Sequence, residues 1–482
     1  MFVGREQNSE KTNAVVAGGT DWLWWRDVDG DVRGMRCLRD KGCRPYSVVD
    51  LLLAVAELLL AVGSGAKRVR VLMTGEKKER EWFIPVATAI RLENYNHAYR
   101  AANYSIDCVN GETLHFSVGL AEAWTIEESA SIAAVQYARA SRMIKSEFGF
   151  DLLSSPGMTG CFALESALPE KVNSEALDSE VFPDILHRRV TQGRSEVFLP
   201  NEVKALYLYD RKFAYAADCR LEMPCGQAEF IPNGTFEPYK PAFYQVIFRV
   251  PENWLHVGLL PVKSDGGWEW PQFGTYETFV AEPELRIAIA QGWEVDVLGK
   301  WAFSSGRPLE SWRNRLVDLY NTSEPALAKV YRNILLHTIG ALFARTWKRE
   351  RIVTHSEFME IEGDAVFSAE MLESGMVKLD DELERGKRFY MPHWAAYTWS
   401  RARAALVNAM LRVPVEKVLA CHVDAIVTSE PVELATANPP KDGIGQFRLK
   451  GELHFPSLER IETKARLFEL MRMAEAAKGG AQ

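Results

Sequence analysis

Two apolar, β-like runs each carry one aspartate, and this pair constrains the fold of the 482-residue chain more than any other feature. The run over residues 205–209 ends on Asp210, and the run over residues 418–428 carries Asp424 in its middle. Carboxylates on neighbouring rigid strands suit hard cations, which take oxygen ligands. Two such ions can clamp the attacking and leaving oxygens of a phosphoryl transfer. We therefore predict that folding brings Asp210 and Asp424 into one site, although they lie far apart in the sequence.

Three further residues fit the same chemistry. Tyr215 follows Asp210 by five positions, and Lys329 and Arg332 are three residues apart, so they share one helical face. A cation on a facing helix can neutralise charge on a triphosphate. Each feature alone has a plainer interpretation: a strand aspartate as an edge residue, the basic pair as a solvated helix face, and Tyr215 as part of the core.

The charge balance limits the class of protein. The formal net charge is −8, whereas a small, wholly basic nucleic-acid-binding protein has a high isoelectric point. A large enzyme with a local basic groove is still allowed, because phosphate contacts need only one groove. The length is enough for about two to four domains.

The cysteines and the apolar runs indicate an intracellular protein. The seven cysteines include no CxxC pair, which argues against a disulfide framework and a zinc site and favours a reducing compartment. The apolar run over residues 51–62 is shorter than the roughly 20 residues of a membrane-spanning helix, and the N-terminus lacks the apolar region of a signal peptide. We expect a protein of the host cytoplasm or nucleoid, with no signal peptide, transmembrane segment or membrane partner.

The periodicity of apolar residues predicts an α+β chain. Residues 22–123 mix short β-like runs, such as 69–75 and 81–90, with a helical run, which is typical of an α/β layer. We expect a β-hairpin over 195–210 that turns at Asn201 and Glu202, strands and loops over 224–275, and a single strand over 417–428. The expected helices cover residues 49–62, 125–148, 153–168, 283–291, 308–320, 325–348, 394–411 and 461–478.

The stretch from 184 to 453 resembles family B DNA polymerases, in particular the small viral and plasmid-borne ones that include the protein-primed group. LYLYDRKFAYA is similar to the palm motif Asp-x-x-Ser-Leu-Tyr-Pro, which aligns Asp210 with the metal-binding Asp and Tyr215 with the Tyr that excludes ribonucleotides. CHVDAIV is similar to Tyr-x-Asp-Thr-Asp-Ser-Ile read without its first residue. Asp424 then matches the second, metal-binding Asp, and His422 stands at the first.

Other segments resemble the same family in the same order. Residues 332–340 are similar to the fingers motif Lys-x3-Asn-Ser-x-Tyr-Gly, with Arg332 at the Lys. Gln192-Gly193-Arg194 resembles the Gly-Gly/Arg linker before the palm, residues 392–401 the helix before the last palm motif, and residues 444–452 the strand pair after it.

The resemblance implies a right-hand polymerase with palm, fingers and a small thumb, preceded by an α/β exonuclease-like domain. The N-terminal domain would cover residues 1–185, the palm 186–280 and 351–430, the fingers 281–350, and the thumb or C-terminal region 431–482. The N-terminal domain is expected to lack nuclease activity, because no strand-borne Asp-x-Glu appears and Ser141 stands where the family has an Asp.

The resemblance also implies the site. Asp210, Asp424 and the backbone carbonyl of Arg211 would hold Mg²⁺, with Mn²⁺ as an alternative. Tyr215 would pack under the sugar of a deoxynucleoside triphosphate, whose phosphates meet Arg332 and Lys329. Candidates for contacts with the DNA template and primer backbones are Arg194 and Lys450.

The implied function is template-directed DNA polymerase activity at a primer 3′ end, in replication of a virus or mobile element, with room for a priming protein. Two rival hypotheses stay open. Leu336, His337 and Ile339 replace the Asn, Ser and Tyr of the fingers motif, which favours a catalytically eroded polymerase-like protein that binds nucleic acid or acts as a scaffolding subunit. An RNA-synthesising or priming variant is the second rival.

Overall fold

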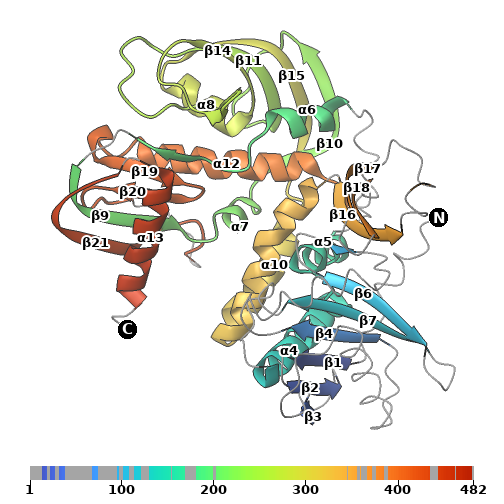
Figure 1. The fold of residues 1–482 in the computed structure, drawn as a ribbon. Coiled ribbons are helices and arrows are strands. Elements are labelled where there is room, and N and C mark those ends of the chain that lie inside the picture. The colour runs from blue at the N-terminus through green and yellow to red at the C-terminus, as the bar shows by residue number, and fades with distance from the viewer. Residues whose placement is uncertain are drawn as a thin grey trace. The chain divides into compact units, whose positions relative to one another are not determined.

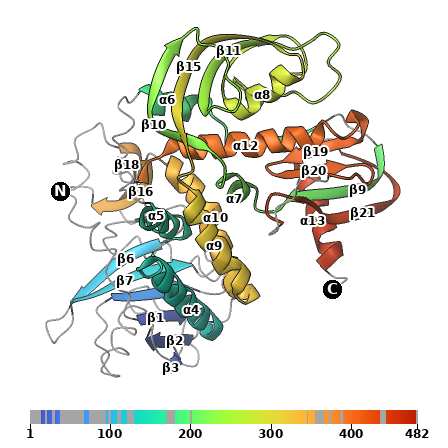
Figure 2. The same cartoon turned by 180° about the vertical axis from the view of Figure 1, so that it is seen from behind.

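The chain forms two compact units in a computed structural model (Figures 1 and 2). Unit 1 comprises Met1–Val172 and Asn314–Tyr390, and unit 2 comprises Asn173–Arg313 and Met391–Gln482. The structure describes residues 14–18, 22–27, 32–37, 68–73, 95–96, 101–107, 113–120, 130–153, 155–168, 181–198, 202–344, 346–354, 359, 366–371, 376–384, 389–434, 443–461 and 463–479. Within these ranges, no helix has the length and apolar character that crossing a bilayer requires.

Unit 1 contains a seven-stranded mixed sheet in the order β3-β2-β1-β4-β7-β6-β5. β1, β4 and β7 pair in parallel at its centre, and the outer strands pair antiparallel. The sheet confirms the strand predicted over 69–75, whereas the helix over 49–62 and the strand over 81–90 lie outside the described residues. The strands are β1 (Ala14–Gly18), β2 (Trp22–Asp27), β3 (Val32–Cys37), β4 (Arg68–Met73), β5 (Tyr95–Asn96), β6 (Ala101–Asp107) and β7 (Thr113–Leu120).

Unit 1 also contains the helices α4 (Ala130–Phe148), α5 (Pro156–Ala167) and α10 (Pro325–Phe343). The Ser155 side chain caps α5 by accepting a hydrogen bond from the Met158 N–H. Gly160 allows α5 to meet α10 closely, because a Cβ there would lie 1.6 Å from Thr338 Oγ1. Ser141 and Tyr137 of α4 both bond the segment 151–153, so their observed role is structural.

The helix predicted over 325–348 is too long. α10 ends at Phe343, and β16 (Thr346–Thr354) follows it. The backbone of β16 pairs antiparallel with β18 (Met376–Glu384), which also pairs with β17 (Val366–Met371). Pairing across this sheet therefore ends the helix earlier than the apolar pattern suggested. Helix α9 (Glu310–Thr322) precedes α10 at the boundary between the units.

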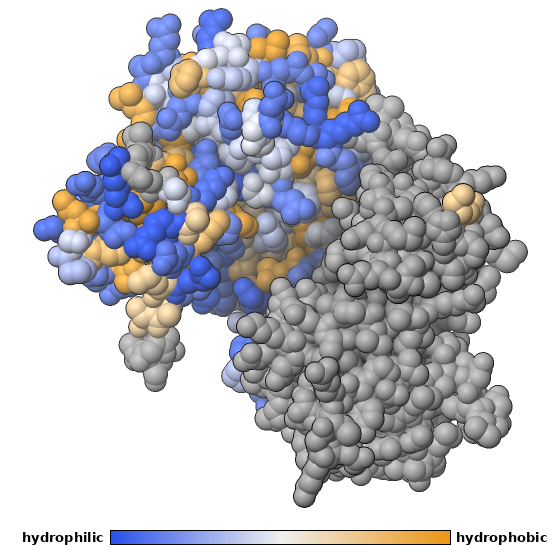
Figure 3. Space-filling model, viewed as in Figure 1, coloured by the Kyte–Doolittle hydropathy of each residue, from blue (hydrophilic) through white to orange (hydrophobic). Residues whose placement is uncertain are grey.

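Unit 2 contains two sheets. The first is an antiparallel sheet in the order β10-β15-β11-β14, with a small hairpin of β12 and β13. Its aromatic core includes Phe243 and Phe279, whose rings stack 5.9 Å apart. On the face drawn in Figure 3, hydrophilic and hydrophobic residues are interspersed over this region. The elements are α6 (Val181–Arg189), β10 (Met223–Pro232), β11 (Ala242–Arg249), β12 (Val262–Ser264), β13 (Gly267–Glu269), β14 (Thr275–Ala281), α8 (Glu282–Ala290) and β15 (Glu294–Gly306).

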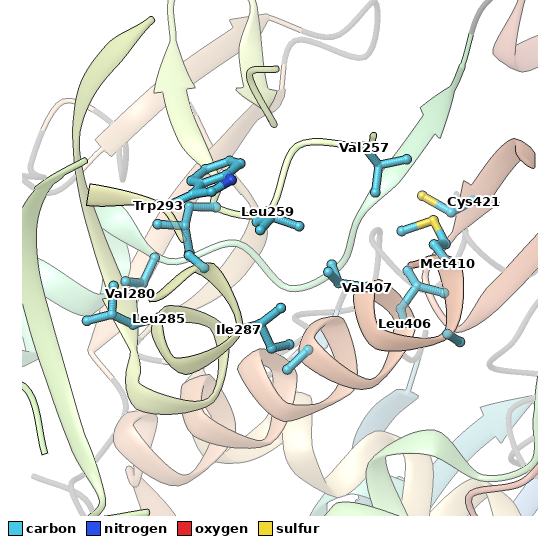
Figure 4. Close-up of a cluster of buried hydrophobic side chains, with 14 of the residues drawn as sticks. Val257, Leu259, Val280, Leu285, Ile287, Trp293, Leu406, Val407, Met410 and Cys421 are labelled. Carbon is cyan, nitrogen blue, oxygen red and sulfur yellow. The ribbon is translucent and has the colours of Figure 1, made fainter. Parts of the chain in front are cut away.

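The second sheet of unit 2 is antiparallel, in the order β21-β9-β20-β19-β8. Side chains alternate along β9, so Leu206 and Leu208 pack in the cluster with α13, while Tyr209 packs in the cluster with α12. Figure 4 shows part of the α12 cluster, with Met410 near Cys421 of β19. The elements are β8 (Ser195–Val197), β9 (Glu202–Arg211), α7 (Ala214–Asp218), α12 (Pro392–Met410), β19 (Val418–His422), β20 (Ala425–Thr428), β21 (Phe447–Arg460) and α13 (Lys464–Gly479).

Two strand predictions in this sheet are wrong in their pairing. β8 and β9 exist but do not form a hairpin, because β19 and β20 lie between them. The backbone groups of β8 bond β19 instead, and the Phe198 N–H extends this pairing to Leu419 O at 2.9 Å. The single strand predicted over 417–428 is a hairpin of β19 and β20, in which His422 pairs with Ala425 across a two-residue turn.

Candidate active site

The sheet of unit 2 brings Asp210 and Asp424 together. β9 and β20 pair antiparallel with Asp210 opposite Ala425, and Asp424 directly precedes Ala425. The Arg211 N–H donates to the Asp424 carbonyl at 3.0 Å, which ties the end of β9 to the turn. Two carboxylates from distant parts of the chain therefore lie on adjoining backbone of one sheet.

The turn that carries Asp424 is held in an uncommon conformation. Val423 has φ 56°, in the left-handed region that β-branched residues rarely adopt. The Val423 N–H donates to Arg194 O at 2.7 Å, and Gly193 lies against the Val423 side chain. The segment before β8 thus holds the turn. Phe213, which precedes α7, also has a positive φ of 49°. Strained backbone at both sides of the carboxylates is typical of a functional site.

The two carboxylates repel each other. Burial, and then the neighbouring charge of Asp210, raise the pKa of Asp424 to about 6, while Lys450 and Arg211 oppose this rise. The Lys450 ammonium lies 4.0 Å from Asp210 Oδ1, so it offsets part of the negative charge. Paired oxygen donors with uncompensated charge fit a divalent hard cation. The described residues contain no group of three or more His, Cys, Asp or Glu side chains that could hold a metal.

The Arg211 side chain has a structural role beside its backbone. Its guanidinium makes two bonds to Asp218, of 2.8 and 2.9 Å, and donates to Gly445 O. Gly445 has φ 87°, and a Cβ there would lie 2.8 Å from the Ala217 Cβ. These contacts fix α7 against the end of β9. Sequence reasoning missed Asp218 and Gly445, because their contacts with Arg211 follow no local periodicity.

Tyr215 and His422 flank the carboxylates with neutral side chains. Tyr215 lies in α7, where burial and the charge of Asp424 raise its pKa to about 12 although Arg403 lowers it. His422 ends β19, with Nδ1 3.2 Å from Ser195 Oγ and its ring against Phe468. Burial, and then Lys464, lower the pKa of His422. Neither side chain adds charge at neutral pH.

The environment of Arg194 argues against its predicted contact with DNA. The side chain is 0% exposed, donates to Glu196 and to Gly258 O, and its guanidinium lies 4.9 Å from the Trp270 ring centre. A guanidinium enclosed in this way stabilises the fold and is not exposed to contact a nucleic-acid backbone. The Arg194 backbone carbonyl nevertheless accepts the hydrogen bond from the Val423 N–H and so helps to hold the turn that carries Asp424.

The remaining predicted residues lie in different places. Lys450 is on β21, beside Asp210, with a side chain that is 40% exposed. Lys329 and Arg332 lie on α10 in unit 1, so their relation to the carboxylates of unit 2 stays a prediction. Within unit 1, burial and then the Arg332 charge lower the pKa of His337.

Because the pKa of Asp424 is raised in the folded protein, we expect its charged carboxylate to lower the stability of the metal-free protein. Between pH 4 and about 6 the unfolded chain loses this proton before the folded chain does, so stability falls as pH rises through that window. Asp424→Asn removes the penalty. We expect the variant to unfold with a free energy higher by about 1–3 kcal/mol at pH 7, and to match the wild type near pH 4.

Urea unfolding in EDTA at pH 4, 5, 6 and 7 measures this difference. A lower stability of Asp424→Asn at pH 7, or a difference that does not change between pH 4 and pH 7, would contradict the electrostatic account. Adding Mg²⁺ should stabilise the wild type more than the variant if the pair binds the ion, because a ligand of the folded state adds stability by mass action.

Comparison with known proteins shows the fold. No protein-family model matches the chain, and no curated protein matches it in sequence. Among solved structures, Phi29 DNA polymerase complexed with primer-template DNA and incoming nucleotide substrates has a TM-score of 0.60 at 10% identity, covering 92% of this chain and 84% of that one.

Two further structures of the same polymerase agree. The complex with primer-template DNA in a post-translocation state has a TM-score of 0.61 at 10% identity, over 94% of this chain and 89% of that one. The complex with single-stranded DNA has a TM-score of 0.59 at 10% identity, over 95% and 93%. The chain therefore has a mixed helix-and-sheet fold that resembles Phi29 DNA polymerase over most of its length.

Proposed function

We propose that the chain is a template-directed DNA polymerase that adds deoxynucleotides to a primer 3′ end by two-metal phosphoryl transfer. The observation that carries this proposal is the pair formed by Asp210, on β9, and Asp424, in the turn directly before the neighbouring strand β20 of the same antiparallel sheet. The fold supports it, because similar structures are of a DNA polymerase complexed with primer-template DNA and nucleotides.

Each residue has a role in this proposal. Asp210, Asp424 and the Arg211 carbonyl would hold Mg²⁺ or Mn²⁺, which when bound supplies charge neutralisation at the reacting phosphate. The neutral Tyr215 packs under the sugar. On the fingers helix, Arg332 and Lys329 meet the triphosphate, and Lys450 contacts the DNA backbone.

The domain roles are part of the same proposal. Residues 186–280 and 351–430 would form the palm, 281–350 the fingers and 431–482 the thumb region, after an exonuclease-like domain over 1–185 without nuclease activity. The C-terminal region also contributes β21 to the sheet of Asp210, so this strand would serve the palm. Replication of a virus or mobile element, with a priming protein as partner, is the biological setting that we propose.

A second candidate is a catalytically eroded polymerase-like protein that binds nucleic acid or acts as a scaffolding subunit. One observation favours it: the position of the first Asp in the family motif is His422, whose ring is turned to Ser195 and adds no carboxylate to the site. The two candidates differ in whether a bound primer is extended.

Primer extension by the full chain tests the proposal. A labelled primer on a DNA template is supplied with deoxynucleotides and Mg²⁺ or Mn²⁺, and DNA binding is followed by fluorescence anisotropy. We expect metal-dependent extension that copies the template. Binding without extension on any template would favour the eroded protein, and extension with ribonucleotides alone would favour an RNA-synthesising variant.

A further inference from the structure

Lys450 is an extra residue in the strand ladder beside Asp210. Along β21, Leu449 pairs with Tyr209 and Gly451 pairs with Leu208, so Lys450 has no partner of its own in β9. Such a bulge re-aims the side chain of the extra residue, and bulges are common next to active sites. Here the bulge places the ammonium within 4.0 Å of Asp210 Oδ1.

A second carboxylate holds the same ammonium from the other side. Glu475 of α13 has its Oε1 3.0 Å from Lys450 Nζ, which is hydrogen-bonding distance, whereas the 4.0 Å to Asp210 is not. Both Lys450 and Glu475 have side chains that are 40% exposed. The ammonium is thus shared unequally, and Glu475 is its nearer partner.

Close packing of backbone places Glu475 at this point. A Cβ on Gly451 would lie 2.4 Å from Ala474 O and 3.0 Å from Glu475 N, so α13 meets β21 where the strand has no side chain. Ala474 is fully buried in the cluster under α13. Figure 1 shows α13 beside β21 and β9. The position of Glu475 therefore follows from the core of this layer and not from a mobile helix end.

Glu475 attracts the Lys450 ammonium from one side, and Asp210 attracts it from the other. If Glu475 were neutral, the ammonium would keep its attraction to Asp210 and Asp424, and it would approach them. An ammonium at the carboxylates competes with any other cation for the same negative charge. With Glu475 charged, the carboxylate pair keeps more of that charge.

We propose that Glu475 is a positioning residue that holds the Lys450 ammonium back from Asp210 and so keeps the carboxylate pair available to a divalent cation. The cation part of this inference rests on the proposed function. The pairing of Lys450 with Glu475 does not rest on it.

Binding of Mn²⁺ to the full chain, without DNA or nucleotide, tests the inference. The free ion is counted by electron paramagnetic resonance. We expect Glu475→Gln to weaken Mn²⁺ binding by roughly 3–10-fold and Lys450→Met to strengthen it. In the Lys450→Met background, Glu475→Gln should have no effect, because a double-mutant cycle isolates the pair.

The matched control is Glu469→Gln. Glu469 lies on the same helix but pairs with Arg466, and its side chain is 52% exposed. If Glu475→Gln binds Mn²⁺ as tightly as Glu469→Gln does, the inference is overturned. A weakening that persists without Lys450 also overturns it, because Glu475 would then act on the ion directly.

A second measurement observes the ammonium itself. The ¹⁵Nζ signal of Lys450, assigned by its loss in Lys450→Met, should shift in Glu475→Gln and not in Glu469→Gln. An unchanged signal would show that Glu475 does not hold Lys450, whatever the Mn²⁺ result.

These readouts separate the inference from the proposed function. A wild type that extends primers while Glu475→Gln binds Mn²⁺ normally overturns the inference alone. A wild type that shows the expected Mn²⁺ pattern but extends no primer overturns the proposed polymerase activity alone. If the wild type binds no Mn²⁺ at all, the cation part of both is wrong.

Discussion

Replacing Asp424 by Asn should reduce primer extension by roughly 10²–10³-fold or more, because the change removes one of the two carboxylates that we propose hold the metal ions at the reacting phosphate. Asparagine keeps the size and the carbonyl oxygen of the side chain but loses its charge. Asp210→Asn should cause a similar loss, since both residues adjoin the same backbone pairing between β9 and β20.

Stability separates this chemical effect from damage to the fold. Most substitutions that abolish activity leave unfolding as an alternative explanation. Asp424→Asn is expected to stabilise the metal-free protein at pH 7, because burial and Asp210 raise the pKa of the native carboxyl. If the variant is more stable than the wild type but inactive, its loss of activity is due to the missing carboxylate and not to unfolding. This exchange of stability for activity is common at functional sites.

The comparison requires a matched acid elsewhere in unit 2. Asp296 lies on β15, in the other sheet, and is exposed. Initial rates of primer extension with Asp296→Asn should equal those of the wild type. If Asp424→Asn extends primers as fast as Asp296→Asn does, the carboxylate pair is not the catalytic site and the proposed function loses its main support.

Local sequence signals predicted much of the fold. α5, α8, α9, α12 and α13 lie close to their predicted ranges, because the apolar period of a helix is a local property. The strands of β9 and β4 were likewise visible as short apolar runs. The two aspartates were found from the sequence because a charged residue at the end of an apolar strand stands out against its surroundings.

Pairing and burial could not be predicted in the same way. The turn at Val423 carries neither Gly nor Asn, which are the usual signals of a two-residue hairpin, so one strand was predicted where two exist. Arg194 looked like a DNA contact because a basic residue in a linker gives no sign that Glu196 and Trp270 enclose it. The Lys450 bulge and its partner Glu475 depend on how α13 packs on β21, which no local pattern specifies.

Glu284→Gln should destabilise unit 2 by about 3–5 kcal/mol, because it leaves a buried charge without its partner. Glu284 of α8 and Arg403 of α12 are 2% and 3% exposed and form two hydrogen bonds of 2.8 Å each. The Arg403 guanidinium also donates to the carbonyls of Thr191 and Gln192. The pair therefore clamps α8, α12 and the segment before β8 together.

Urea unfolding measures the loss, and two further variants show its cause. Glu430→Gln breaks an ion pair between Glu430 and Lys417, whose side chains are 59% and 33% exposed, and it should leave the free energy of unfolding almost unchanged because solvent screens such a pair. Combining Glu284→Met with Arg403→Met should restore most of the stability, since an apolar pair leaves no uncompensated charge. Equal losses in Glu284→Gln and the double variant would contradict this explanation.

The clamp also reaches the carboxylate site through one continuous stretch of backbone. Thr191 and Gln192, which accept from Arg403, are followed by Gly193 and Arg194, and the Arg194 carbonyl holds the strained Val423. Loosening the clamp should therefore free the turn that presents Asp424. We expect Glu284→Gln to slow primer extension even at temperatures where the protein stays folded, and Glu430→Gln to leave the rate unchanged. If Glu284→Gln is destabilised but extends primers at the normal rate, the clamp supports the fold alone and the turn keeps its conformation without it.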